Sequence, residues 1–161
     1  MRLFLSGLVI TFFIGLVVLQ PLFREEIQQP IQFNHQAHQD LECSGCHEFV
    51  ETEFFAGLPP IDTCMLCHET ALTESQEEEK IRTLASEGNP IEWQPLFRQP
   101  AHVFYSHRRH VGIAGLECQQ CHGDIGESTQ PPVWVQNLTM DACISCHEQN
   151  QLEAGCVDCH R

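Results

Sequence analysis

Positively charged side chains are scarce in this sequence. Eight Lys plus Arg stand against 22 Asp plus Glu, which gives a formal net charge of −14 at pH 7. Nucleic-acid binding depends on clustered cations that displace counterions from phosphates. The one adjacent basic pair is Arg108–Arg109, so the composition excludes a nucleic-acid partner.

Cysteine is absent outside one repeated motif. All ten cysteines fall in five Cys-x-x-Cys-His strings, so none is left for a disulfide framework or a reactive thiol. Zinc ribbons also use Cys-x-x-Cys, but they do not require a following His each time. In this motif both sulfurs attach to haem and the His binds iron. We therefore predict five covalently bound haem c groups, attached at Cys43 and Cys46, Cys64 and Cys67, Cys118 and Cys121, Cys143 and Cys146, and Cys156 and Cys159, with His47, His68, His122, His147 and His160 as iron ligands.

Methionine, the other common axial ligand, is also scarce. Met1 lies in an apolar run and Met65 inside a motif, so Met140 is the one contender. Five histidines remain beyond the motifs: His35, His38, His102, His107 and His110. They match the five irons one to one and predict bis-histidine ligation, which closes each iron to substrate and favours low-to-middle potentials. His102 stands outside the repeat described below, so Met140 stays open as its alternative, as does the choice of distal His for each haem.

The sequence contains an internal repeat. A Phe/Tyr-x-His-x-x-His segment precedes a Leu-Glu-Cys motif at Phe33–Cys43 and again at Tyr105–Cys118. His35 and His107 are 72 residues apart and Cys43 and Cys118 are 75 apart, which places a three-residue insertion at Val111–Gly115. We predict a di-haem module over residues 25–69, a linker over 70–100 and a tri-haem module over 101–161.

The linker carries no haem motif. Thr73–Gln76 has capping-box form and predicts a helix to Ser86 with Ile81 and Leu84 on one face, ended by Gly88. The proline-flanked segment after it predicts an extended stretch that covers haem or faces a partner, with Trp93, Leu96 and Phe97 as a docking strip. About 135 residues serve five haems, too few for a large core. The expected fold is a loop-rich multihaem cytochrome c with short α-helices and the haems as its core.

Residues 3–23 form a run of 21 uncharged residues. As a helix they would span about 31 Å, the thickness of a bilayer's hydrocarbon core. No small-residue cleavage site follows the run, so residues 1–24 are interpreted as a transmembrane signal anchor, with a removed signal peptide as the alternative. Charge on either side of the run predicts a single-pass protein of the bacterial inner membrane with its haem domain in the periplasm.

Phe33-Asn34-His35 with His38 before a haem motif resembles the class III multihaem cytochromes c. The wider order, with Cys64-Met65-Leu66-Cys67-His68, Pro90-Ile91-Glu92-Trp93, His102–His110, Cys118–Gly123 and Leu138-Thr139-Met140, is similar to the ActA family, the pentahaem cytochrome subunits of alternative complex III. The resemblance covers about residues 30–148.

The resemblance implies an electron-transfer subunit, not an enzyme, within a quinol-oxidising respiratory or photosynthetic complex. Its implied partners are iron–sulfur and integral-membrane subunits, with a downstream cytochrome c or terminal oxidase. It extends to menaquinone-reductase complexes, in which electrons run the other way. A stand-alone quinol dehydrogenase is the nearest rival, but one membrane helix offers little wall for a quinone pocket. A multihaem reductase would need an open iron, and a conductive filament fits poorly with an anchor.

Overall fold

The chain folds into short helices joined by long loops. The computed structural model describes residues 27–96, 100–133, 138–153 and 155–160. An isolated antiparallel bridge between Val103 and His160 is the one extended pairing within these ranges. The expected loop-rich fold is confirmed. Its helices, in chain order, are η2 (Gln36–His38), η3 (Cys43–Gly45), α2 (Ile61–His68), α3 (Gln76–Glu87), η4 (Arg108–Ile113), α4 (Gln119–His122), η5 (Ile125–Glu127), α5 (Met140–Gln149) and α6 (Cys156–Cys159).

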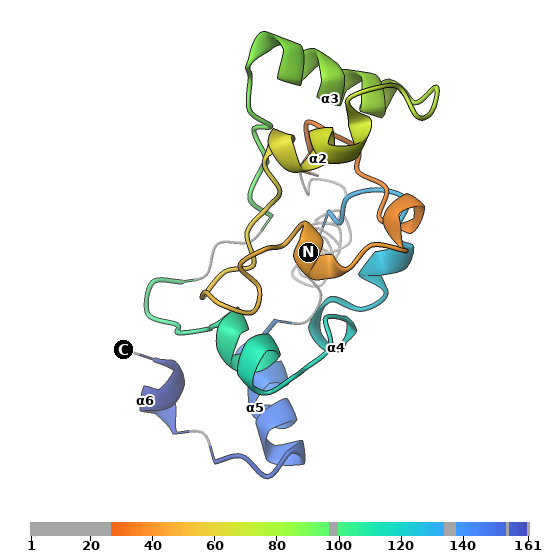
Figure 1. The fold of residues 1–161 in the computed structure, drawn as a ribbon. Coiled ribbons are helices and arrows are strands. Elements are labelled where there is room, and N and C mark those ends of the chain that lie inside the picture. The colour runs from red at the N-terminus through yellow and green to blue at the C-terminus, as the bar shows by residue number, and fades with distance from the viewer. Residues whose placement is uncertain (1–26, 97–99, 134–137, 154, 161) are drawn as a thin grey trace, which may run out of the picture.

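The molecule is elongated. Helices α2 and α3 pack together at one end, α5 and α6 lie at the other, and α4 lies between them (Figure 1). Because helices that carry Cys-x-x-Cys-His motifs occur at both ends and in the middle, the motifs are spread along the long axis of the protein.

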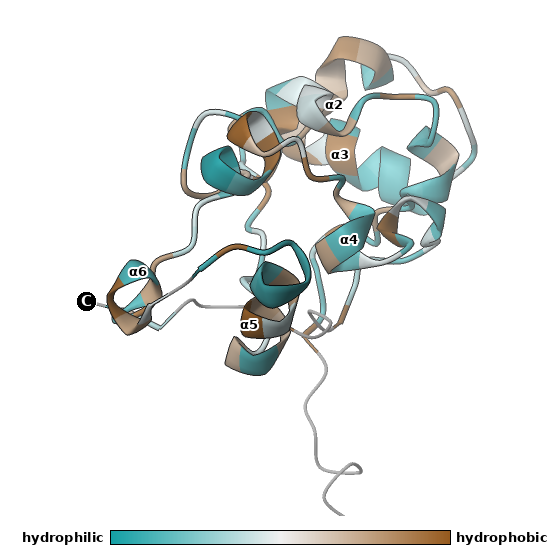
Figure 2. Ribbon diagram, turned by 90° about the horizontal axis from the view of Figure 1, so that it is seen from below, coloured by the Kyte–Doolittle hydropathy of each residue, from teal (hydrophilic) through white to brown (hydrophobic). Residues whose placement is uncertain are grey.

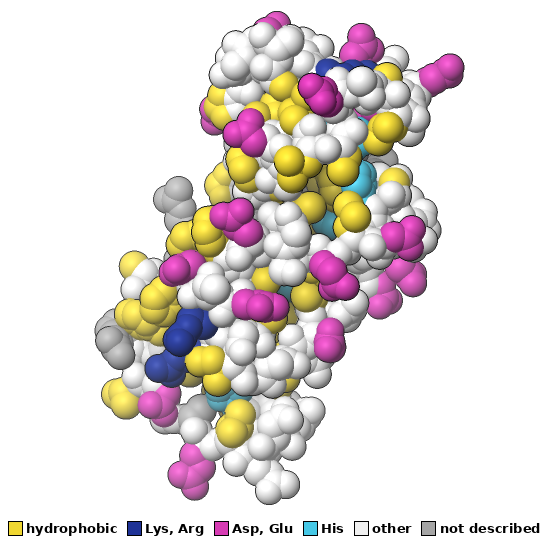
Figure 3. Space-filling view, viewed as in Figure 1, with side chains coloured by type: hydrophobic (Ala, Val, Ile, Leu, Met, Phe, Trp, Pro, Cys, Tyr) yellow, Lys and Arg dark blue, Asp and Glu magenta, His cyan; other side chains and the backbone are white. Residues whose placement is uncertain are grey.

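The polypeptide buries little of its own apolar surface. Ile31, Ile81 and Ile91 form one buried cluster, and Val50 is also buried. No large side chain of the described residues is fully buried, and Leu66 is 82% exposed. Hydrophobic segments occur on most of the helices (Figure 2), and apolar side chains reach the surface along the whole length (Figure 3). Since a stable domain normally covers such side chains, the structure leaves room for apolar groups that the chain itself does not supply.

Helix α3 confirms the predicted helix but begins two residues later than the capping-box pattern suggested. Ser75 is the N-cap, and its hydroxyl accepts a hydrogen bond from the Glu77 N–H at 3.3 Å. Thr73, the expected cap, instead hydrogen-bonds to the carboxylate of Glu78. The helix ends at Gly88, whose φ of 71° suits a residue without Cβ.

The predicted apolar face of α3 is also confirmed. Ile81 is 7% exposed, and Leu84 packs on the same cluster. The cluster joins α3 to α2 and to the extended segment around Ile91, so the linker is part of the folded body rather than a tether.

Trp93 does not form the predicted docking strip. Its ring packs on the buried isoleucine cluster, and its Nε1 donates a hydrogen bond to the Pro59 carbonyl at 3.0 Å. The partner-facing interpretation is therefore wrong for Trp93, because these contacts hold its ring inward. Phe97 of the same strip lies outside the described residues.

The two repeats contact one another reciprocally. In the first repeat, the Gln36 N–H donates to the Ser128 carbonyl at 3.1 Å, in the loop after the third motif. In the second, the His107 N–H donates to the Phe54 carbonyl at 3.1 Å, in the loop after the first motif. Each His-x-x-His segment is thus held by the other repeat's loop. The module boundaries themselves remain predictions.

The insertion predicted at Val111–Gly115 coincides with a widened helix. Residues Arg108–Ile113 form the π-helix η4, and the Ala114 N–H donates to the Arg109 carbonyl five residues back. Extra residues in a helix are commonly accommodated in this way. Gly112 of this helix lies against the first repeat: a Cβ at this position would stand 2.2 Å from the Glu51 carbonyl oxygen.

No helix within the described ranges is long and apolar enough to cross a membrane. The predicted anchor at residues 1–24 lies outside those ranges.

The close approach at Gly112 predicts a strong cost for any side chain there. Gly112→Ala should destabilise the haem-loaded protein by about 1–3 kcal/mol, because backbone must move to admit the methyl group. Denaturant unfolding measures the change. Gly126→Ala is the matched control, since nothing lies within 4 Å of its Cβ position. Equal stability of the two variants would show that the repeats do not depend on this contact.

Candidate functional site

Every Cys-x-x-Cys-His string lies on a short helical segment. The N–H groups of His47, His122 and His160 each donate to the carbonyl of the first cysteine in their motif at 2.8–2.9 Å. These i to i+4 bonds bring the two sulfurs and the imidazole to one side of a turn. All ten thiols are free, and each is exposed or half-buried. Each pair is therefore accessible to a haem edge.

The structure places spare histidines beside motif histidines. His35 and His47 interact electrostatically: burial lowers the pKa of His35 first, and the charge of His47 lowers it further. For the other four pairs the ring centroids are 6.0 Å apart for His38 and His68, 6.4 Å for His107 and His122, 6.2 Å for His110 and His147, and 5.7 Å for His102 and His160.

These separations fit an iron held between two imidazoles. A metal–nitrogen bond is about 2.0 Å and a ring nitrogen lies about 1.1 Å from its centroid, so two rings on opposite sides of one ion stand about 6 Å apart. No group of three or more His, Cys, Asp or Glu side chains within the described ranges could hold a metal ion. Two protein ligands per site therefore suit an iron whose other four ligands come from a porphyrin, and do not suit zinc.

An open hollow of about 380 Å³ lies beside the fourth motif. It is lined by His147 together with Ile144, Glu148, Leu152, Glu153 and Gly155, and so extends from α5 to the start of α6. A mixed apolar and polar wall at a motif histidine is the kind of surface against which a haem packs. We interpret the hollow as part of the haem environment rather than as a separate binding site.

Comparison with known proteins agrees with this geometry. Residues 18–89 match the class III cytochrome c family, and residues 103–161 match cytochrome c7 and related cytochromes c. The chain is a multihaem cytochrome c. It is also 28% identical to the multihaem cytochrome c subunit of menaquinone reductase from Nitratidesulfovibrio vulgaris strain Hildenborough, over 98% of this chain and 89% of that protein. The cytochrome is an electron carrier and not itself a catalyst.

One aromatic ring contacts both distal histidines in each repeat. Phe33 meets His35 edge-on at 4.8 Å and stacks on His38 at 4.6 Å. Tyr105 meets His107 edge-on at 5.0 Å and stacks on His110 at 4.7 Å. The same ring in the same two contacts fixes the direction of both imidazoles, which explains why the repeat contains an aromatic residue two positions before the first His.

Tyr105 is half-buried near the cysteines of the third and fourth motifs. Burial raises its pKa to about 12, and nearby Cys121, Cys143 and Cys118 add to the shift. Its ring therefore lies between the third and fourth motifs, where two neighbouring haems would meet.

In six of the ten candidate ligands the Nδ1 atom faces an oxygen atom, which fixes the ring tautomer when Nε2 binds metal. Most of these oxygens are neutral. The contacts are His38 with Asn34 O at 2.8 Å, His47 with Gly57 O at 2.8 Å, His107 with Phe54 O at 3.0 Å, His110 with Ser106 O at 2.9 Å, and His35 with Ser128 Oγ at 3.2 Å.

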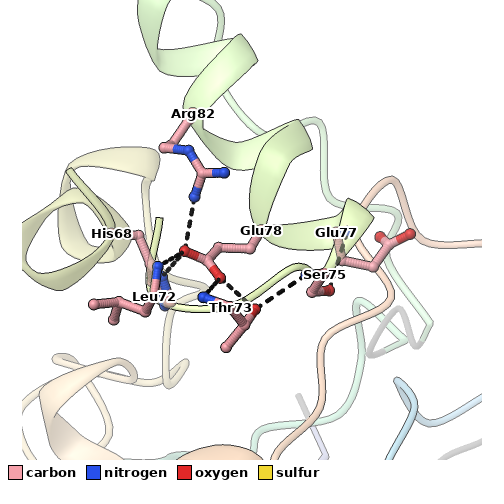
Figure 4. A network of polar contacts seen from close by, with 7 residues as sticks. All are labelled: His68, Leu72, Thr73, Ser75, Glu77, Glu78 and Arg82. Atoms are coloured by element: carbon pink, nitrogen blue, oxygen red, sulfur yellow. Dashed lines mark hydrogen bonds and ion pairs between the residues drawn. The ribbon is translucent and has the colours of Figure 1, made fainter. Parts of the chain in front are cut away.

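His68 differs from these histidines. Its Nδ1 is shielded from solvent and lies 3.2 Å from Oε1 of Glu78, a carboxylate that is only 5% exposed (Figure 4). The distance is that of an ion pair, although the angle is not that of a hydrogen bond.

Glu78 also accepts hydrogen bonds from the Leu72 N–H at 2.7 Å and from Arg82 at 2.7 Å. Hydrogen bonds from Thr73 and Leu72 lead the causes that lower its pKa to about 2, so it carries a negative charge.

Glu78 was not among the residues singled out from the sequence. It lies in the acidic run Glu77–Glu79, which by itself suggests a solvated face. The signal was its spacing: Glu78 precedes the buried Ile81 by three residues, and positions three apart share a helix face. The spacing from Ile81 therefore predicts that Glu78 lies on the buried face of α3.

Charge interactions between thiols show which motifs are neighbours. Burial raises the pKa of the Cys64 thiol, and the charge of Cys46 raises it further. In three more cysteines burial is the main cause of a raised pKa and a thiol of another motif is the next cause. The pairs are Cys118 with Cys43, Cys121 with Cys146, and Cys143 with Cys159. The motifs thus follow one another in the order that begins at Cys64 and continues through Cys43, Cys118, Cys143 and Cys156, consistent with the positions of α2, α4, α5 and α6 in Figure 1. This order differs from the order along the chain.

The geometry also bears on the one ligand left open. His102 stacks on His160 at 5.7 Å, and a hydrogen bond from the Phe104 N–H to the Cys159 carbonyl holds the two segments together. Met140 is 61% exposed at the start of α5. The placement favours His102 over Met140, and the ligand set as a whole remains a prediction.

Removing one distal histidine should open one iron. His107→Ala should give a single high-spin haem that binds carbon monoxide when reduced, because only His122 then remains on that iron. Electron paramagnetic resonance and the carbon monoxide difference spectrum report this. Arg109→Ala, on the same helix, is the control and should stay low-spin.

For the fifth haem, His102→Ala should give the high-spin signal and Met140→Leu should not; the reverse result would identify Met140 as the ligand.

Proposed function

We propose that the cytochrome is the electron-transfer subunit of a membrane complex that exchanges electrons with menaquinone. The observation that carries the proposal is the placement of four spare histidines 5.7–6.4 Å from four motif histidines along an elongated body, with His35 and His47 as the remaining pair. Electrons would pass through five bis-histidine haem c groups between subunits that dock at different points of that row.

The named function of the relative supports one of the alternatives drawn from the sequence. The N. vulgaris protein is a subunit of menaquinone reductase, and the similarity to it spans nearly the whole chain. By analogy this cytochrome would deliver electrons to the iron–sulfur and integral-membrane subunits of such a complex. The narrower assignment to the ActA subunit of alternative complex III, with a downstream cytochrome c or terminal oxidase, uses the same row of haems in the opposite direction.

The residues of the chain determine what the haems can do. When bound, each haem supplies reversible one-electron exchange between ferric and ferrous iron. The two cysteine sulfurs of each motif would hold it through thioethers, and the motif histidine and its paired histidine would bind the iron. A closed iron cannot bind substrate, so the protein limits each site to electron transfer. Quinone chemistry, which needs an enclosed pocket, is left to other subunits.

The row of sites is continuous because neighbours share protein segments. His35 and His38 occupy one helical turn, and so do His107 and His110, so each turn serves two motifs. Positions three apart on a turn have Cβ atoms about 5–6 Å apart. The reciprocal contacts at Ser128 and Phe54 join the two repeats at the first and third motifs.

The proposed location is the periplasmic face of the inner membrane. c-type haem is attached outside the cytoplasm, and the apolar run at residues 3–23 would serve as the anchor. This holds the haem domain beside the integral-membrane subunits that it would serve.

Intact mass of the denatured protein should equal the full chain plus five haems. The reason is that each of five thiol pairs forms two thioethers and the anchor lacks a cleavage site. Washing membranes with high salt should release none of it. A mass corresponding to fewer haems would show a vacant motif, and a mature N-terminus near Gln28 would show that the run is a removed signal peptide.

The cytochrome should purify with iron–sulfur and integral-membrane partners, and the complex should exchange electrons with menaquinone analogues. The measurement is affinity purification after mild detergent, followed by haem reoxidation by a water-soluble naphthoquinone. The cytochrome isolated from the complex serves as control and should react far more slowly, since closed irons cannot bind the quinone. Equal rates would favour the stand-alone quinol dehydrogenase.

A further inference from the structure

At the end of the row formed by α2 and α3, the ligand histidine faces a charged group. Five other ligand histidines do not. His68 faces the buried carboxylate of Glu78, whereas those five face carbonyl or hydroxyl oxygens. We infer that Glu78 is a positioning residue that lowers the reduction potential of the haem attached at Cys64 and Cys67 below that of its neighbours. The inference rests on the proposed function, because it takes His68 as an iron ligand.

The physical basis is the difference in charge between the two oxidation states. Ferric haem carries one more positive charge than ferrous haem, so a nearby anion stabilises the ferric form. The effect is strong where water is excluded, and Glu78 is 5% exposed. A carboxylate at the outer nitrogen of a metal-bound His also makes that ligand more basic. Both effects lower the potential, and neither requires a linear hydrogen bond.

The surroundings of Glu78 keep the carboxylate fixed and charged. It receives hydrogen bonds from Leu72, Thr73 and Arg82, which come from the loop before α3 and from α3 itself. Arg82 is a cation that donates to Oε1, the same carboxylate oxygen that faces His68, and so offsets part of its field. The network therefore tunes the site with two opposite charges, each of which can be removed separately.

This arrangement would make the two ends of the row unequal in potential. The Cys64 site is one end of the order of motifs, so it has a neighbouring haem on one side only. With a lowered potential there, electron transfer from the haem held at Cys64 and Cys67 to the haem held at Cys43 and Cys46 would be downhill. The direction of net flow through the row would still be set by the potentials of the donor and the acceptor.

The test is a redox titration that follows this one haem. In a His38→Ala background, the Cys64 iron alone becomes high-spin, because His38 is the partner of His68. Its signal can then be titrated by electron paramagnetic resonance apart from the four low-spin haems. Adding Glu78→Gln should shift its ferric–ferrous equilibrium at least tenfold toward the ferrous form, which is a rise of 59 mV or more for a one-electron couple.

Two further variants separate charge from structural damage. Glu79→Gln removes the same charge from the exposed side of α3 and should leave the potential almost unchanged. Arg82→Gln should lower the potential, because it removes the cation that offsets Glu78. Opposite shifts for Glu78→Gln and Arg82→Gln cannot both come from a loosened helix. A shift for Glu78→Gln no larger than that for Glu79→Gln would overturn the inference.

Haem content, spin state and potential together separate this inference from the proposed function. If His38→Ala retains five haems but gives no high-spin signal, the ligand pairing is wrong, and the inference fails with it. If the high-spin signal appears and the potential does not respond to Glu78, the ligand pairing holds and the role of Glu78 alone fails.

Discussion

The distance across an iron between two imidazoles is the constraint on which this protein depends. About 6 Å must separate the two ring centroids at each site, and the four measured pairs fall between 5.7 and 6.4 Å. The chain has few other means of holding itself together, since one cluster of three isoleucines is its main buried core. The proposed haem attachment at ten thiols would do for this fold what a large apolar core or disulfides do for other small domains. The many exposed apolar side chains are what one expects of a shell whose interior is porphyrin.

In each repeat, one helical turn carries two candidate distal histidines, and one aromatic ring contacts both of them. Phe33 and Tyr105 make the same pair of contacts, edge-on to the first His and stacked on the second. Because each turn is held by a loop of the other repeat, the first and third motifs meet at the centre of the molecule. The second motif is thereby placed at one end and the fourth and fifth motifs toward the other. An order of sites that differs from the chain order follows from this exchange of loops.

The sequence was most informative where chemistry is local. The ten cysteines and the five motif histidines follow from spacing alone, and the helix with Ile81 on its buried face follows from its period. The pairing of distal histidines could not be predicted, because it depends on how two loops cross between the repeats, at Ser128 and Phe54. Trp93 was misread for a related reason: neighbouring prolines suggested an exposed strip, whereas its half-buried ring packs on an isoleucine cluster that is assembled from three separate segments. Residues 1–24 lie outside the described ranges, so the anchor rests on hydropathy alone.

Glu78 shows how a fold with so little core can still treat its haems unequally. Five of the ligand histidines face carbonyl or hydroxyl oxygens, an arrangement that fixes ring orientation but adds no net charge. Glu78 lies on α3, which has 12 residues and is the longest helix among the described residues, and which packs on α2 and leaves Glu78 only 5% exposed. The linker helix, which carries no haem motif of its own, thus has a reason to be packed on α2. It covers the terminal site and brings it a charge that the short turns elsewhere cannot shield from solvent. A row of nearly identical ligand sets would give its haems similar potentials; a single buried charge at one end would make the terminal haem differ from the rest.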